Sequence, residues 1–322
     1  MFLSIIYLIL GLVLILVGAN ALTDGASSIA RRMGISDLVV GLTVVAFGTS
    51  APELAISLLS AIGGNSELAV GNVVGSNIFN VLMIIGITAM VVPIKITRSI
   101  MTNEIPLVIL SSLALFIMAS SPLLDGSSSA VITRVDGLLL LLFFAIFMRY
   151  TFAQAGSASP SDPAAENAAS GPSMPVWRAV AYVAGGLAAL IFGGDRFVAG
   201  ASDIAKALGV SEAVIGLTIV ATGTSLPELA TSVTAALKGK TGIALGNVIG
   251  SNIFNIFLVL GASATVTPLP MGNVGSLDMT VLLGSAIMFW IFGWFFRQRT
   301  ITRIEGTILT ATYIGYIAAL LW

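Results

Sequence analysis

Two near-copies of one polar stretch contain the residues best suited to chemistry. Residues 48–54 read Gly-Thr-Ser-Ala-Pro-Glu-Leu, and residues 223–229 read Gly-Thr-Ser-Leu-Pro-Glu-Leu. Each is followed by a stretch of the form Gly-Asn-Val-X-Gly-Ser-Asn-Ile-Phe-Asn, at 71–80 and at 246–255. Carboxylate, hydroxyl, amide and backbone carbonyl oxygens are the ligands that hard cations such as Na⁺ and Ca²⁺ prefer. The two stretches therefore predict cation binding.

A proline precedes each glutamate and predicts a break in the helix that carries it. Pro52 has no backbone N–H, so it releases the carbonyl of Gly48 from the helix ladder. Thr49 and Glu53 are four residues apart and share the helix face beside this break. The second copy repeats the arrangement around Glu228. In hydrocarbon, such a break persists only where it lines a polar cavity or is buried in protein.

The two glutamates need partners if they lie inside a membrane. A charged side chain at the bilayer centre costs roughly 2.5–3.5 kcal/mol on insertion scales. Each glutamate could instead be protonated, or paired with a basic residue in a purely structural role. No Lys or Arg is expected at a comparable depth in the sequence. A bound cation is therefore the better partner.

The helix after each glutamate adds a polar stripe. Asn72, Ser76 and Asn80 recur every four residues and lie on one face. We expect the hydroxyl and amide groups of the following residues to be cation ligands: Ser76, Asn80, Ser251 and Asn255. For the remaining asparagines, ligation and hydrogen bonding between helices both stay open. These are Asn72, Asn77, Asn247 and Asn252.

The charge of the predicted site indicates a mechanism. Two ionised glutamates carry about two negative charges, which one Ca²⁺ or two to three Na⁺ can balance. Both loads together would repel each other strongly, and mutually exclusive occupancy is the condition for antiport. Mg²⁺ fits less well because it demands octahedral geometry and keeps its waters.

Composition defines the elements that must position these groups. Of the 322 residues, 57% are hydrophobic and only 9% are charged, against about 25% charged residues in a soluble domain. The chain is therefore predicted to be an all-α polytopic membrane protein. It has no cysteine or histidine, which excludes disulfides, thiolate nucleophiles and histidine proton relays.

Ten apolar segments are long enough to span a bilayer, on the basis of about 20 residues per span. They lie near 3–30, 36–62, 66–91, 102–121, 131–151, 176–206, 211–237, 241–267, 276–296 and 302–321. The region between the fifth and sixth is rich in Ala, Ser and Pro and predicts a flexible linker. The predicted domains are residues 1–151, a cytoplasmic linker at 152–175, and residues 176–322.

The two halves are related by a duplication. An offset of 175 residues pairs Glu53 with Glu228, and an offset of 169 pairs 133–137 with 302–306. A unit of five spans, an odd number, must enter the membrane in opposite directions when it is repeated in tandem. The sequence thus predicts ten transmembrane helices as two inverted five-helix repeats, an arrangement typical of transporters with a substrate site near the midplane.

Lysine and arginine predict the orientation through their excess in cytoplasmic loops. With the N-terminus outside, eleven basic residues fall on the cytoplasmic side and three at or near the outer side. The three are Arg134, Arg196 and Lys206. We therefore expect a multi-pass protein of the cell (inner or plasma) membrane with both termini extracytoplasmic.

The doubled motif resembles the alpha repeats of the sodium/calcium exchangers, in the calcium/cation antiporter superfamily. Those repeats carry Gly-Thr-Ser-x-Pro-Glu and Gly-Ser-Asn-x-x-Asn/Asp, and the match covers essentially the full chain. The resemblance is to the prokaryotic type without a regulatory domain. It implies ten helices, a diamond of four cation sites, and electrogenic exchange of about three Na⁺ for one Ca²⁺ by alternating access.

The resemblance also implies roles for individual residues. Glu53 and Glu228 would bind Ca²⁺ with Thr49 and Thr224, and Asn80 and Asn255 would lie in the middle. The flanking Na⁺ sites would be formed by Ser50, Ser76, Ser225 and Ser251, with the carbonyls of Ala46 and Ala221. The long first and sixth helices would slide. Some relatives, including the potassium-dependent branch, have aspartate where this chain has Asn255, which favours potassium-independent exchange.

Other functions stay as alternatives. A Ca²⁺/H⁺ antiporter is the runner-up because glutamates can carry protons, although the Gly-Asn-x-x-Glu pattern of that branch is missing. A cation channel could be built on the same polar helices, but inverted halves with kinked helices argue against it. An enzyme is not expected, because no nucleophile or histidine accompanies the glutamates. The expected partners are Ca²⁺, Na⁺ and the lipid bilayer, with no cofactor, no nucleic acid, and a monomer as the functional unit.

Overall fold

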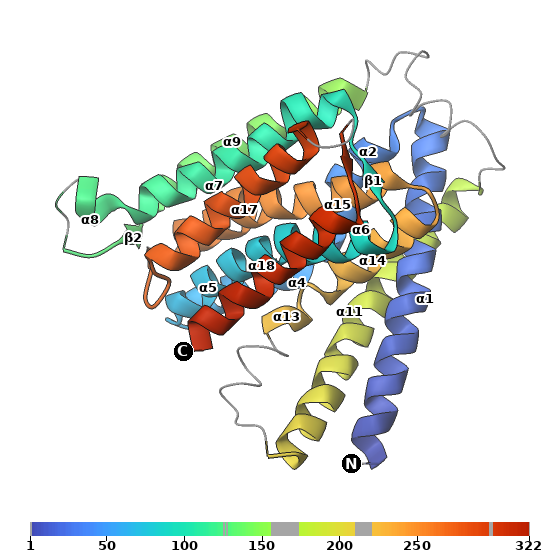
Figure 1. Ribbon diagram of the computed structural model, residues 1–322, viewed down its shortest axis with the longest axis horizontal. Helices are drawn as coiled ribbons and strands as arrows, with labels where there is room; N and C mark the ends of the chain where they lie inside the picture. Colours follow the sequence, from blue (N-terminus) through green and yellow to red (C-terminus); the bar gives the residue numbers. More distant parts are fainter. Residues whose placement is uncertain are drawn as a thin grey trace. The chain divides into compact units, whose positions relative to one another are not determined.

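The structure is a computed structural model that describes residues 2–124, 126, 128–155, 174–209, 221–295 and 299–321. The regular structure of the described chain is helical apart from four strands of two residues each (Figure 1). It forms two compact units, which are described separately below. Unit 1 contains the chain up to Ser50 and residues 151–247, and unit 2 contains residues 51–150 and 248–322. Most of the predicted linker, residues 156–173, lies outside the described residues.

Unit 1 is built on two long helices, α1 (Phe2–Met33) and α11 (Val176–Ala207), which lie side by side (Figure 1). They are antiparallel, because Gly11 faces Gly193 and Gly18 faces Gly186. A Cβ atom added to Gly18 would lie 2.8 Å from the Gly186 carbonyl oxygen, so only glycine allows this approach. The 175-residue offset relates Gly11 to Gly186 and Gly18 to Gly193. The crossing is therefore built from equivalent positions of the two repeats.

The rest of unit 1 carries parts of both motifs. The first motif follows α2 (Asp37–Val40), a π-helix η1 (Gly41–Val45) and α3 (Ala46–Thr49). The second lies in α13 (Ala221–Gly223), α14 (Leu226–Leu237) and the first half of α15 (Thr241–Ile253). The seventh predicted span, 211–237, is described only from Ala221 onward.

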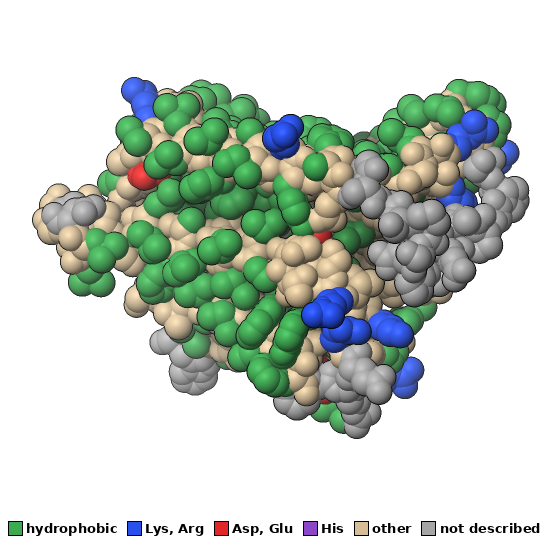
Figure 2. Space-filling model, turned by 90° about the horizontal axis from the view of Figure 1, so that it is seen from above, with side chains coloured by type: hydrophobic (Ala, Val, Ile, Leu, Met, Phe, Trp, Pro, Cys, Tyr) green, Lys and Arg blue, Asp and Glu red, His purple; other side chains and the backbone are tan. Residues whose placement is uncertain are grey.

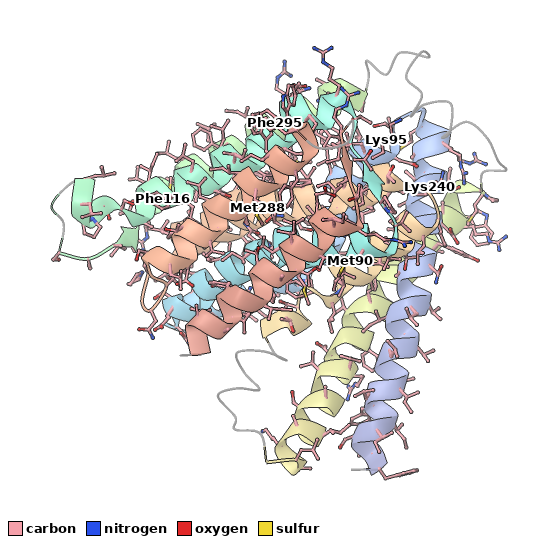
Figure 3. All side chains as sticks on the ribbon, in the orientation of Figure 1. Met90, Lys95, Phe116, Lys240, Met288 and Phe295 are labelled. Atoms are coloured by element: carbon pink, nitrogen blue, oxygen red, sulfur yellow. The ribbon has the colours of Figure 1, made fainter. Side chains whose placement is uncertain are left out.

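Unit 2 contains the remaining helices. Its first-repeat elements are α4 (Ala51–Ile62), α5 (Ser66–Phe79), η2 (Asn80–Ile84), α6 (Ile85–Val91), η3 (Ile100–Glu104), α7 (Ile105–Ala119), α8 (Ser121–Leu124) and α9 (Arg134–Ala155). Its second-repeat elements are the end of α15, η5 (Phe254–Leu260), α16 (Gly261–Val266), α17 (Ser276–Phe295) and α18 (Arg303–Leu321). Figure 3 labels Phe116 on α7 and Met288 on α17, two helices that pack against each other.

Short antiparallel strand pairs close the two ends of unit 2. β1 (Ile94–Lys95) pairs with β4 (Thr300–Ile301), and β2 (Val131–Ile132) pairs with β3 (Leu269–Pro270). The offset of 175 relates β1 to β3, and the offset of 169 relates β2 to β4. The two pairs lie at opposite ends of the unit (Figure 1). Equivalent loops of the two repeats therefore face opposite ends of unit 2.

Seven described helices are long and apolar enough to cross a membrane, and a bent pair, 37–49 with 51–62, adds an eighth. Apart from the seventh span, which is described only in part, the helix bounds agree with the predicted spans within a few residues, and the count of ten stays a prediction. The motif-bearing helices Ser66–Val91 and Thr241–Val266 have 78% and 94% of their most apolar windows buried, against 28% for α1 and 22% for α9.

The described surface suits a lipid environment. Large apolar side chains such as Ile9, Val13 and Leu142 are exposed on α1 and α9. Figure 2 shows hydrophobic side chains over much of the described face, with Lys and Arg gathered in a few places. Together with the apolar helices, this is the surface of a multi-pass membrane protein.

Candidate functional site

Both motif helices are broken at the predicted place. Ser50 leaves the helical conformation, with φ −85° and ψ 5°, and the segments on either side are bent by 46°. In the second copy, α13 ends at Gly223 and α14 begins at Leu226, with Ser225 at φ −90° and ψ 6°. Pro52 and Pro227 each remove a backbone donor four residues after a glycine carbonyl. The predicted kinks are confirmed.

In unit 1 the second glutamate is bound to the first motif. Glu228 is 1% exposed, and Ser50 donates from Oγ to Oε1 of Glu228 over 3.2 Å. Thr49 donates from Oγ1 to Oδ1 of Asn247 over 3.0 Å. Asn247 in turn donates to the Glu228 carbonyl over 3.2 Å and to Ser232 Oγ over 3.0 Å. Unit 1 therefore brings residues of both motifs into one buried cluster.

The other predicted ligands of unit 1 flank this cluster in the chain. The carbonyl of Ala46 accepts hydrogen bonds from the Ser50 N–H at 3.0 Å and from Thr49 Oγ1 at 3.4 Å. Ser225 is fully buried. The buried Oγ1 of Thr224 has no hydrogen-bond partner among the described residues. The backbone of Ala221 begins α13.

In unit 2 the first glutamate lies in the matching cluster. Glu53 is fully buried on α4, which packs against α5 and η5. Asn72 donates to the Glu53 carbonyl over 3.4 Å and to Ser57 Oγ over 3.0 Å. These are the bonds that Asn247 makes 175 residues later. The conserved geometry of the two copies indicates that both amides hold the glutamate-bearing helix in place.

Of the other two asparagines, Asn77 joins two helices and Asn252 bonds within its own helix. Asn77 donates to the carbonyl of Asn252 over 3.2 Å, and its Oδ1 accepts from Nδ2 of Asn255 over 3.0 Å. Asn252 donates to the carbonyl of Val248 in its own helix. These hydrogen bonds support a structural role for the asparagines. Asn255 uses only its nitrogen, because its buried Oδ1 has no partner in the described part of the chain.

Ser76 and Asn80 differ from the neighbouring Asn77 in their side-chain hydrogen bonding. They are 2% and 1% exposed. Neither the Ser76 hydroxyl nor either polar side-chain atom of Asn80 has a hydrogen-bond partner within the described ranges. Leaving a buried polar group unsatisfied costs about 1–3 kcal/mol. These oxygens, with that of Asn255, are therefore available to a ligand, and Ser251 is equally buried on α15.

Two serines that support the site were missed in the sequence. Ser57 and Ser232 are buried and accept the amide bonds of Asn72 and Asn247. Each lies one helical turn after a motif glutamate, at the same 175-residue offset. This repetition at helical spacing was the available signal.

The chemistry of these clusters is that of oxygen ligands. Among the described residues, no three His, Cys, Asp or Glu side chains lie together so that they could hold a metal ion. Hydroxyl, amide and carbonyl oxygens must therefore complete any cation site around each glutamate. Such a donor set fits Na⁺ and Ca²⁺ better than transition metals.

Comparison with known proteins gives one consistent result. The family model described as sodium/calcium exchanger protein matches residues 3–153 and 178–322. The chain is 40% identical to the proposed antiporter CaxA of Alkalimonas amylolytica, over 98% of each protein. It is 32% identical to the sodium/calcium exchanger MaX1 of Methanosarcina acetivorans, over 99% of each.

A solved structure agrees with the fold. A structure of the sodium-calcium exchanger NCX_Mj, soaked with Na⁺ and Ca²⁺, superimposes with a TM-score of 0.82. It is 32% identical in sequence, and the match covers 99% of this chain and 98% of that chain. The described relatives are exchangers and antiporters, which are transporters and not enzymes.

Proposed function

The chain belongs to the sodium/calcium exchanger protein family, and we propose that it exchanges Na⁺ for Ca²⁺ across a cell membrane by alternating access. Exchange is electrogenic, with about three Na⁺ moving against one Ca²⁺, so that net charge crosses the bilayer. It requires no cofactor, and the monomer is the functional unit. The family supports cation exchange in general, and the residues below carry the finer proposal.

The observation that carries this proposal is a set of buried side-chain oxygens in unit 2, on the helices that follow the two motif glutamates in the chain. Asn80 Oδ1, Ser76 Oγ and Asn255 Oδ1 are buried without a partner in the described residues. The buried amides of Asn77 and Asn247, by contrast, donate hydrogen bonds. Burial of a polar group away from water costs free energy, and contact with a bound cation offsets that cost. The unpaired oxygens are ligands, and the paired amides are scaffold.

The glutamates supply the charge that selects between the ions. Glu53 and Glu228 are ionised when a cation is bound and act as Ca²⁺ ligands with Thr49 and Thr224. The Na⁺ ligands are the hydroxyls Ser50, Ser76, Ser225 and Ser251, with the carbonyls of Ala46 and Ala221. One Ca²⁺ or several Na⁺ can balance these carboxylates, but not both together. This exclusion couples the two fluxes.

Ten helices in two inverted repeats would give the protein equivalent inward and outward pathways. The arrangement of unit 2 supports this, since equivalent strands β1 and β3 lie at opposite ends. The basic residues of 94–98 and 299–303 lie around one strand pair, as cytoplasmic loops require under the positive-inside rule. Both termini are then extracytoplasmic.

The pair formed by α1 and α11 is the moving part. Its glycine contacts are backbone to backbone, with Gly193 close to Gly11 and Gly200 close to Ser4. Such a smooth, tightly packed crossing keeps the two helices together as one body. Alternating access then requires this pair to change position as a unit.

The first experiment tests which ion drives Ca²⁺ transport. Purified protein in proteoliposomes is given Na⁺, K⁺ or H⁺ gradients one at a time, and ⁴⁵Ca²⁺ uptake is measured. We expect an outward Na⁺ gradient to drive uptake and an inside-negative potential to oppose it when Na⁺ leaves. Uptake driven by H⁺ without Na⁺ would instead indicate a Ca²⁺/H⁺ antiporter, and flux independent of any counter-ion would indicate a channel.

Isosteric variants test the glutamates. Glu53→Gln and Glu228→Gln remove the charge without changing the shape, and we expect both to abolish Na⁺-driven uptake. Glu104→Gln is the matched control, because Glu104 is also fully buried but accepts a hydrogen bond from Tyr150 and lies outside both clusters. Uptake that survives in the two motif variants would refute the proposed site.

A further inference from the structure

A polar cavity of about 240 Å³ lies in unit 1, outside the cluster around Glu228. It adjoins the second half of α1 and the turn that follows α14. Asp24, Ser27, Arg31, Lys238 and Lys240 contribute to its lining. Figure 3 labels Lys240 at this end of α1. Three of these five side chains are basic, so the cavity differs from the cation sites in the sign of its charge.

The ion pairs in and beside the cavity leave it positive. Lys238 Nζ is 2.7 Å from Oδ1 of Asp24, and Lys240 Nζ is 3.6 Å from Oδ2 of Asp37. With Arg31, three positive charges face two negative ones, which leaves about one positive charge. The side chains of Lys238 and Asp24 remain 29% and 44% exposed. Small solutes can therefore reach the cavity.

Two donors that line the cavity have no hydrogen-bond partner among the described residues. Ser27 is only 3% exposed, and its Oγ has no hydrogen-bond partner in the part of the chain that is described. The same holds for Nε of Arg31. Both atoms are hydrogen-bond donors, and an unsatisfied buried donor costs about 1–3 kcal/mol. An anion with several acceptor oxygens would satisfy both at once.

The wall of the cavity is completed by Met174, two residues before α11 begins. Met174 donates from its backbone N–H to Ser28 Oγ over 2.8 Å, and Arg32 Nε donates to the Met174 carbonyl over 2.8 Å. These bonds fix the chain against α1. The cavity is thus formed by three separate segments of unit 1, and a ligand in it would hold them together.

We propose that this cavity binds a phosphate group. Ser27 Oγ and the Arg31 guanidinium donate to its oxygens, and the ammonium groups of Lys238 and Lys240 balance its charge. Arginine and lysine both recognise phosphate through charge-assisted hydrogen bonds. The cavity is much larger than the ~30 Å³ that one water molecule occupies in the liquid. The group comes from inorganic phosphate or from the headgroup of an anionic phospholipid.

The binding experiment uses the full chain purified without phosphate. Thermal unfolding is measured with inorganic phosphate and with chloride at equal ionic strength. We expect phosphate to raise the melting temperature of the wild type. Arg31→Gln should weaken the phosphate affinity at least about tenfold, because a hydrogen bond to a charged group is lost.

A second arm tests the phospholipid source. The protein is placed in nanodiscs of phosphatidylcholine with or without phosphatidylglycerol. If phosphatidylglycerol stabilises the wild type but not Arg31→Gln, while inorganic phosphate has no effect, the headgroup is the source. A response to inorganic phosphate in detergent identifies the free anion instead.

Two further variants keep the test decisive. Arg178→Gln removes the same charge from an exposed residue that bonds Tyr182, and it should respond like the wild type. Ser27→Ala removes a donor without a change of charge, and it should weaken binding even if Arg31→Gln misfolds. Equal responses in chloride and phosphate together with no stabilisation by phosphatidylglycerol, or unchanged responses in both cavity variants, would overturn the proposal. The readout is binding, so its failure is separate from failure of the exchange function.

Discussion

Ser50 donates a hydrogen bond from its hydroxyl to the carboxylate of Glu228 over 3.2 Å. The hydroxyl lies at the helix break of the first motif, and the carboxylate belongs to the second. A hydrogen bond to a charged group contributes about 1.5–3 kcal/mol. The bond therefore joins the helix break of the first motif to the carboxylate of the second within unit 1.

Replacement of Ser50 by alanine tests this relationship. Ser50→Ala removes one proposed ligand and one stabilising bond, so we expect the Na⁺ concentration for half-maximal Ca²⁺ release to rise about tenfold. The measurement is Na⁺-dependent ⁴⁵Ca²⁺ efflux from proteoliposomes. Ser111→Ala serves as control, since Ser111 is an equally buried serine that bonds only the Val108 carbonyl of its own helix in the described contacts. Equal Na⁺ dependence in both variants would contradict a role for Ser50.

Variants at Asn80 and Asn77 distinguish a proposed ion ligand from an asparagine that joins helices. Asn80→Ala removes an amide without a partner in the described residues, so we expect little loss of stability but at least tenfold weaker ion binding. Asn77→Ala removes two bonds between helices and leaves the Asn255 donor unsatisfied. We expect it to cost about 1–3 kcal/mol of stability. Thermal unfolding and Ca²⁺ titration on the same samples compare the two.

The opposite pattern would reverse these assignments. If Asn80→Ala lowered the melting temperature more than Asn77→Ala while Ca²⁺ affinity stayed normal, Asn80 would be a structural residue. The unpaired oxygen would then have a different explanation, and the proposed central ligand would be lost.

The breaks and the buried glutamates could be predicted from sequence because their causes are local. Pro52 lacks a donor whatever surrounds it, and Ser50 leaves the helical conformation as expected. The roles of the asparagines could not be separated in this way. Asn77 and Asn80 are both amides on one polar helix, and only the packing of α5 against η5 provides partners for one and not the other.

The glycines of α11 that contact α1 could not be predicted from the sequence either. Gly185 and Gly186 are adjacent and identical in sequence, yet a Cβ at Gly185 would meet nothing within 4 Å. A Cβ at Gly186 would lie 2.7 Å from the backbone nitrogen of Leu22. Which glycine faces α1 depends on the register of two helices about 170 residues apart in the chain, and no local pattern fixes that register.

These neighbouring glycines provide a matched pair of variants. Gly186→Ala forces α1 and α11 apart, so we expect a lower melting temperature and slower exchange. Gly185→Ala adds the same methyl group in open space, and it should behave like the wild type or be slightly more stable, because alanine favours helix by about 1 kcal/mol. Melting temperature and initial ⁴⁵Ca²⁺ uptake rates are the measurements. Equal effects of the two variants would refute the importance of this crossing.

Asn255→Asp replaces one side-chain atom and adds a negative charge to the proposed site. Asn255→Asp replaces Nδ2, which donates to Asn77 Oδ1 over 3.0 Å, with an oxygen that cannot donate when ionised. Two acceptors then face each other in a buried site, and we expect the cation-free variant to lose about 1–3 kcal/mol of stability.

Added Ca²⁺ should restore this loss in Asn255→Asp, because the new carboxylate is a further ligand and a further negative charge. The rise in melting temperature with Ca²⁺ should therefore be larger in the variant than in the wild type. Asn103→Asp makes the same chemical change at an exposed asparagine, and its response to Ca²⁺ should match the wild type. If Ca²⁺ stabilised Asn255→Asp no more than Asn103→Asp, the side chain at 255 would not contact the transported ion, and a potassium-independent exchange set by Asn255 would have no basis.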